Sequence, residues 1–73
     1  MFERVVVKGQ KDETLLPRIL RLLSKQGAQV QSLHMDASAD TVELEIKLQD
    51  TAAAQVAKLL QKQVAVVSVN TIA

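Results

Sequence analysis

The segment 41–49, TVELEIKLQ, alternates strictly between apolar and polar residues. Val42, Leu44, Ile46 and Leu48 hold the even positions, and polar or charged residues hold the odd ones. Because successive side chains of a strand point to opposite faces, this period of two predicts a strand with one covered face and one open face. Such a strand is typical of an antiparallel sheet, which limits the folds open to a chain of 73 residues.

The other segments complete a βαββαβ order. We predict further strands over residues 2–8, 28–37 and 64–71, and helices over residues 14–26 and 52–62. This order predicts an α+β, ferredoxin-like fold, in which a four-stranded antiparallel sheet carries both helices on one face. Residues 1–73 are expected to form a single domain.

The first helix has a recognisable start and end. Six apolar residues recur at helical spacing and are expected to face inward: Leu15, Leu16, Ile19, Leu20, Leu22 and Leu23. Thr14 is expected to cap its N-terminus, as Thr51 is for the second helix. Pro17 is tolerated in a first turn, where N–H groups have no intrahelical acceptor. Gly27 is expected to end the helix in a left-handed conformation.

The second strand is expected to lie at an edge of the sheet. Its apolar residues, Val30, Leu33 and Met35, change phase along the strand, which predicts a bulge near Gln31 and Ser32. Exposed strand edges pair with other chains unless charges or prolines prevent it. We therefore predict a homodimer, with this self-association edge: Val30, Gln31, Ser32, Leu33 and His34.

Composition excludes several classes of function. Cysteine is absent, so disulfides and thiolate metal sites are excluded. A net charge of +1 argues against nucleic acid or an anionic membrane as partner. Arg18, Arg21 and Lys25 form a helix stripe, which we interpret as a solvated face. The N-terminal residues lack the features of a signal peptide, and a cytoplasmic protein is expected.

No set of residues predicts catalysis or metal binding. His34 is the only histidine, and one ligand does not make a metal site. Glu43 and Glu45 lie two apart on an open sheet face, which offers no cleft to shift their pKa values. The segment GQKDET after the first strand has no Walker lysine and no arginine. It therefore supports neither a phosphate loop nor an enzyme of the acylphosphatase type.

The order of the motifs resembles the ACT domain. The helix run LLPRILRLL is followed by Gly27 and then by VQSL at residues 30–33, which is similar to the family's "VLxRI" helix start, helix-ending glycine and "I-x-S-L" strand. Within that family, SLHM at residues 32–35 and KQVAVVSV at residues 62–69 resemble segments of the short, isozyme II type small subunits of acetohydroxyacid synthase (acetolactate synthase).

This resemblance implies a non-catalytic regulatory subunit in branched-chain amino-acid biosynthesis. The expected partner is the acetohydroxyacid synthase large subunit, and thiamine diphosphate, Mg²⁺ and FAD are expected in that partner and not in this chain. The alternative is a free-standing ACT module that binds a small amino-acid effector. The fold alone supports that alternative.

The resemblance also places a possible effector loop between the first strand and the first helix. The loop comprises Gln10, Lys11, Asp12, Glu13 and Thr14. The family's "N-x-P-G" motif is replaced here by KDET, residues 11–14, so the glycine that permits close backbone approach is lost. Glu13 would also repel a ligand carboxylate. These departures argue against effector binding at this loop.

Overall fold

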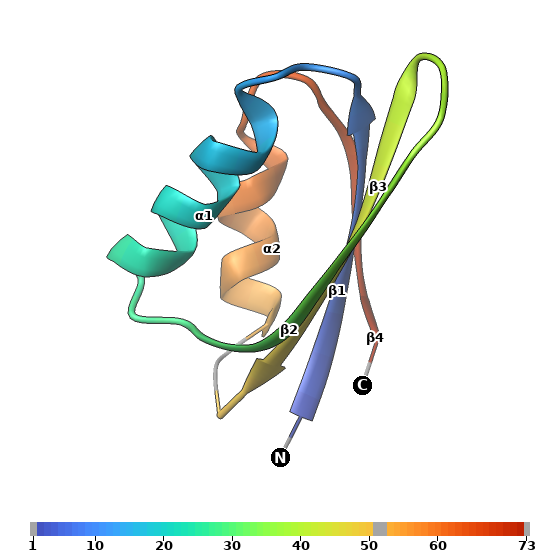
Figure 1. The fold of residues 1–73 in the computed structure, drawn as a ribbon. Coiled ribbons are helices and arrows are strands. Elements are labelled where there is room, and N and C mark those ends of the chain that lie inside the picture. The colour runs from blue at the N-terminus through green and yellow to red at the C-terminus, as the bar shows by residue number, and fades with distance from the viewer. Residues whose placement is uncertain (1, 51–52, 73) are drawn as a thin grey trace.

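The computed structural model describes residues 2–50 and 53–72, which form a sheet with two helices on one face (Figure 1). The elements are β1 (Phe2–Gln10), α1 (Leu15–Lys25), β2 (Gln29–Ala37), β3 (Thr41–Gln49), α2 (Ala53–Gln61) and β4 (Val66–Ile72). The predicted βαββαβ order and the ferredoxin-like arrangement are confirmed.

The sheet has the strand order β2-β3-β1-β4, with every neighbouring pair antiparallel. The two central strands are paired over their full length, from Phe2 opposite Gln49 to Gln10 opposite Thr41. β2 and β4 are the two edges, so the second strand lies at an edge as predicted. Antiparallel hairpins need only short connections, and residues 38–40 suffice between β2 and β3.

An aliphatic core fills the space between sheet and helices. The strict alternation of β3 places Val42, Leu44, Ile46 and Leu48 in that core, as predicted. The other buried apolar residues are Val5, Val7, Leu15, Ile19, Leu23, Ala53, Val56, Ala57, Leu60 and Val69. Burying apolar area is the main favourable term in folding, and here aliphatic side chains supply it.

Three strands differ from the prediction in their bounds: β1 and β4 by two residues at one end, β2 by one residue at its start, and β4 by one more at its end. β1 continues to Gln10, because Gly9 and Gln10 pair with Val42 and Thr41 of β3. The Gln10 backbone N–H also donates a hydrogen bond to the Ala65 carbonyl oxygen at 2.8 Å. Placing Gly9 and Gln10 in a loop was therefore wrong. β4 begins at Val66 and not at residue 64, because Ala65 adopts a positive φ of 75°, which is incompatible with an extended strand.

Both helices lie within their predicted ranges, α1 over Leu15–Lys25 and α2 over Ala53–Gln61, while the predicted start of α2 at residue 52 lies outside the described residues. Gly27 has a φ of 66° and ends α1 in the left-handed conformation, as predicted. Thr14 occupies the N-cap position, but its side chain makes no capping hydrogen bond to the helix. Leu20 does not face inward, since 45% of its surface is exposed. Thr51, the predicted cap of α2, lies outside the described residues.

The bulge in β2 is confirmed. The pairing with β3 shifts register between Val30 and Ser32, so that Gln31 is the extra residue. The apolar residues before and after the shift therefore lie on the same face of the sheet: Val30 is opposite Leu48, and Leu33 is opposite Ile46. The bulge thus reconciles the two apolar phases of the strand.

Candidate effector groove and association edge

The connection between β1 and α1 is held by hydrogen bonds at its first residues. The Lys11 backbone N–H donates to the Asp40 carbonyl at the tip of the β2–β3 hairpin, at 2.9 Å. The backbone N–H of Gln10, one residue earlier, donates to the carbonyl oxygen of Ala65, which lies just before β4. The loop is therefore fixed between two turns that are distant in sequence.

Asp12 organises the start of α1. Its Oδ1 accepts hydrogen bonds from the Thr14 backbone N–H at 2.9 Å and from the Thr14 hydroxyl at 2.8 Å. Its Oδ2 lies 3.2 Å from Nη2 of Arg18, and Arg18 also donates from Nε to Thr14 Oγ1 at 3.1 Å. Asp12, and not Thr14, is thus the side chain that accepts an unpaired N–H at this helix end.

This arrangement favours the charged form of Asp12. Hydrogen bonds from the Thr14 backbone N–H and hydroxyl, followed by the nearby Arg18 guanidinium, hold the pKa of the Asp12 carboxyl below its usual value. The same contacts fix the path of the chain from the loop into α1.

A groove of about 340 Å³ lies beside this loop. Ten residues line it: Lys11, Asp12, Glu13, Leu15, Leu16, Pro17, Met35, Ala37, Val42 and Leu44. The charged residues belong to the loop, and aliphatic side chains from α1, β2 and β3 form the rest. Its volume is at the small end of the range for small-molecule sites.

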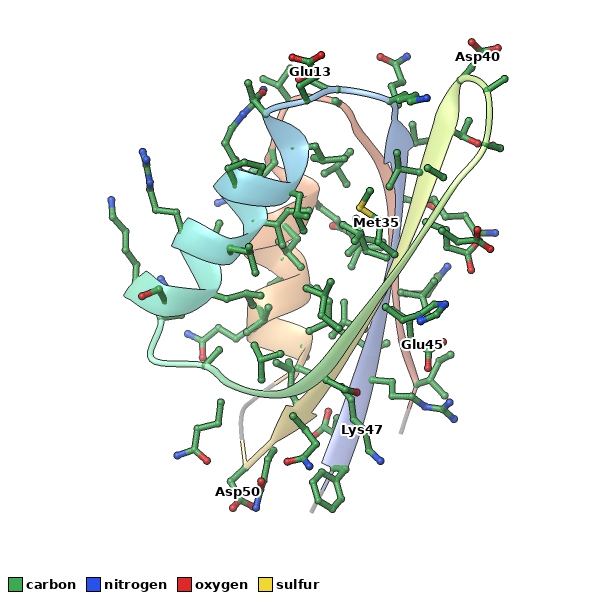
Figure 2. The ribbon with its side chains drawn as sticks, viewed as in Figure 1. Glu13, Met35, Asp40, Glu45, Lys47 and Asp50 are labelled. Atoms are coloured by element: carbon green, nitrogen blue, oxygen red, sulfur yellow. The ribbon has the colours of Figure 1, made fainter. Side chains whose placement is uncertain are left out.

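The structure brings together only part of the predicted effector loop. Lys11, Asp12 and Glu13 line the groove. Gln10 belongs to β1, and the Thr14 side chain is bonded to Asp12 and Arg18. Sequence reasoning missed the contribution of Met35, whose strand pairs with β3 far from the loop in sequence. Figure 2 shows Met35 on the helix side of the sheet.

The predicted association edge is exposed along β2. Val30, Gln31, Ser32 and His34 are exposed, and Leu33 is half-buried. The helices do not cover the apolar side of this strand, so Val30 and Met35 keep 40% and 46% of their surface accessible. They were predicted as the apolar set of the strand, and the structure leaves them uncovered.

The opposite face of the sheet carries charged side chains together with the exposed apolar residues Phe2 and Val67. Arg4 Nη1 lies 3.3 Å from Glu45 Oε1, and Lys47 Nζ lies 4.7 Å from the centre of the Phe2 ring. His34 is opposite Glu45 in the register, on this same open face. Figure 2 shows Glu45 and Lys47 directed away from the helices.

The open face carries a groove of about 440 Å³, and its charged lining residues Lys8, Asp36 and Glu43 are all exposed. Within residues 2–50 and 53–72, no charged or polar side chain is buried, and no three His, Asp or Glu residues gather as a metal site would require. Catalytic groups generally need burial or close charges to shift their pKa values. In the same part of the chain, no helix is long and apolar enough to cross a membrane.

Solved structures of similar shape include an ACT domain. The chain matches the ACT domain of GTP pyrophosphokinase from Chlorobium tepidum with a TM-score of 0.85 and 12% identity, covering 99% of this chain and 97% of that one. It matches a homoserine dehydrogenase from Thiobacillus denitrificans with a TM-score of 0.79 and 13% identity, covering 97% of this chain and 16% of that one.

A third match is aspartate kinase from Clostridium acetobutylicum, with a TM-score of 0.61 and 21% identity, covering 96% of this chain and 17% of that one. At these identities the likeness establishes the fold, which is that of the ACT domain. No family model and no curated protein matches the sequence.

Proposed function

We propose that this chain is a non-catalytic regulatory module that acts by docking, as the small subunit of acetohydroxyacid synthase in the cytoplasm. The observation that carries a role in assembly is the uncovered apolar side of β2, where two copies would join, with Val30 and Met35 exposed beside the half-buried Leu33. A small domain gains stability by covering such a strip with a partner. The particular enzyme rests on the sequence resemblance.

The catalytic chemistry then belongs entirely to the large subunit. Thiamine diphosphate, Mg²⁺ and FAD would be bound there, and this chain would act on the activity through contact alone. A module in which residues 2–50 and 53–72 bury no polar side chain suits that division of labour.

The direct test mixes the purified chain with a cognate large subunit and measures acetolactate formation together with co-elution on a sizing column. We expect a higher rate and a stable complex. A rate that stays at the level of the large subunit alone, with no co-elution, would disprove the proposed role.

Self-association through β2 is part of the same proposal. Pairing of two β2 edges would join two sheets and cover the exposed strip in each copy. The bulge at Gln31 interrupts the ladder, so regular backbone pairing would involve residues 32–37, and Val30 before the bulge would contribute its exposed side chain to the covered strip.

A second candidate function is the binding of a free amino acid in the groove beside the β1–α1 loop. Its charged rim offers Lys11 to a carboxylate, and Asp12 or Glu13 to an ammonium group, above an aliphatic surface formed by residues such as Leu16 and Met35. This combination favours a small aliphatic amino acid over a polar one.

Calorimetric titration with the twenty amino acids tests this candidate. We expect heat from branched aliphatic amino acids and a loss of that heat in Met35→Lys, which places a charge in the groove. Silence across the whole set would remove amino-acid binding and leave the docking role standing.

A further inference from the structure

The helix layer carries all of its charge with one sign. The sequence holds nine Lys and Arg residues and eight Asp and Glu residues, yet residues 14–35 and 53–72 contain no carboxylate at all. Five of the nine cations fall in these segments: Arg18, Arg21, Lys25, Lys58 and Lys62. The net charge of +1 therefore conceals a strongly cationic helix side.

Three of these cations line one groove. The groove has a volume of about 260 Å³ and lies along α1 beside the C-terminal part of α2. Spacings of three and four residues place Arg18, Arg21 and Lys25 on one face of α1. Its remaining lining residues are apolar or neutral: Leu22, Gln26, Leu59 and Gln63. The groove thus combines a cationic wall with an apolar surface.

Two of the three cations are available to a partner. Arg18 is engaged by Asp12 at 3.2 Å, which offsets its charge. Arg21 and Lys25 form no ion pair within residues 2–50 and 53–72. The C-terminus of α1 contributes only about half a negative charge from its macrodipole, so two full positive charges dominate.

The residues that line this groove favour one class of anionic partner over the others. A membrane surface requires exposed aromatic or large apolar residues, and the described helices expose only Leu20 of this kind. Single-stranded nucleic acid requires aromatic side chains on which bases stack, and the one aromatic residue, Phe2, lies on the sheet. A phosphate backbone would also leave Leu22 and Leu59 without apolar contacts.

We propose that this groove binds an acidic segment of a partner protein. Carboxylates of the segment would pair with Arg21 and Lys25, and its apolar side chains would pack on Leu22 and Leu59. The role of such contact rests on the proposed function, since a module that acts by docking needs a surface for its catalytic partner. The groove lies on the helix side, so it leaves the β2 edge free for self-association.

The test uses the ¹⁵N-labelled 73-residue chain and a synthetic twelve-residue peptide of Glu and Leu at helical spacing. A peptide with Lys in place of Glu is the control ligand. We expect the Glu peptide alone to shift amide resonances of residues 18–26 and 59–63, with affinity that falls as NaCl rises from 50 to 300 mM. Shifts confined to other parts of the chain would overturn the proposal.

Two matched pairs of substitutions separate the groove from the general charge of the helix layer. Arg21→Gln with Lys25→Gln removes two charges from the groove, and binding should weaken roughly tenfold. Lys58→Gln with Lys62→Gln removes the same charge outside the groove, where binding should change less than twofold. If both pairs of substitutions weaken peptide binding equally, the proposal that the peptide binds in this groove is wrong.

Two further measurements keep the alternatives apart. Tighter binding of a twelve-base-pair DNA duplex, or of vesicles containing phosphatidylserine, than of the Glu peptide would overturn the choice of an acidic protein segment. Co-elution with the acetohydroxyacid synthase large subunit tests the enzyme separately. If the parent chain does not bind the large subunit, the proposed function fails. The peptide titration then still shows whether the groove binds an acidic segment.

Discussion

At the scale of single residues, the two glycines of this chain serve different physical ends. Gly27 occupies a left-handed conformation with open space around it. Glycine is favoured there because it adopts a positive φ without strain. At Gly9 what matters is space: a Cβ would lie 2.6 Å from the Ala65 carbonyl oxygen and 3.2 Å from Leu15 Cδ2. The close approach of β1 to the turn before β4 therefore depends on the absence of a side chain at Gly9.

We expect Gly9→Ala to destabilise the protein by about 1–3 kcal/mol, because the contact is with backbone that cannot rotate away. Thermal unfolding should show a lower midpoint. Gly27→Asn is the matched control, since Asn tolerates the left-handed region, and it should stay close to the parent. A Gly9→Ala protein as stable as Gly27→Asn would show that the turn at Ala65 shifts freely.

Asp12 gives stability a defined dependence on pH. Its pKa is lower in the folded protein than in the unfolded chain, so its contribution is present above the unfolded pKa of about 3.9 and is lost as pH falls through the folded pKa. Asp12→Asn should therefore be less stable than the parent at neutral pH, with the difference shrinking below about pH 4. Denaturant unfolding at several pH values measures it, and a constant difference would contradict this account.

At the scale of elements, β2 differs most from its neighbours. β3 and β1 each have both edges paired and one face covered, whereas β2 has one free edge and an apolar side that the helices leave exposed. The charged and polar residues of the strand, including His34 and Asp36, lie on the opposite, open face with Glu45 and Glu43. Its helix side is therefore an exposed apolar strip beside a free strand edge, where a second chain could pair.

We expect Val30→Asp to weaken self-association at least tenfold, because it places a charge in the strip that assembly would cover. Val67→Asp is the matched control, since Val67 is 69% exposed on the other edge strand, β4. Sedimentation at a series of concentrations measures both. Loss of dimer in Val67→Asp alone would identify β4 as the association edge. Leu33→Asp should also abolish assembly, but Leu33 packs against the core, so that variant needs a check of folding.

At the scale of the whole molecule, the core is small and entirely aliphatic. A single core in a chain of this length rarely supplies more than about 3–5 kcal/mol. Association that covers the β2 strip would then form a sizeable part of the total stability. Folding and assembly are expected to be coupled.

This coupling predicts a melting temperature that depends on concentration. A tenfold increase in protein concentration should raise the midpoint by about 3–6 °C, if two chains fold and pair together. Differential scanning calorimetry across two decades of concentration measures it. Val30→Asp should show no such dependence, and a parent protein with a concentration-independent midpoint would contradict coupled assembly.

The sequence alone determined the elements of this protein. The alternation of residues 41–49, the helical spacing of the leucines in α1, the phase change in β2 and the glycine after α1 are local patterns, and each is visible within a few residues. Connections from strand to helix to strand are almost always right-handed, so this order of elements leaves few ways to bury the apolar faces. The ferredoxin-like arrangement therefore followed from the sequence.

Only the tertiary structure decided what surrounds each residue. The groove joins Met35 and Leu44 to the β1–α1 loop, the Gly9 contact joins β1 to Ala65, and the cationic groove joins α1 to α2. Periodicity tells which side of an element is apolar, but coverage of that side depends on where other elements pack. The sequence therefore predicted that Val30 and Met35 lie on the apolar side of their strand. Only the positions of the helices in the folded protein show that these two residues stay exposed.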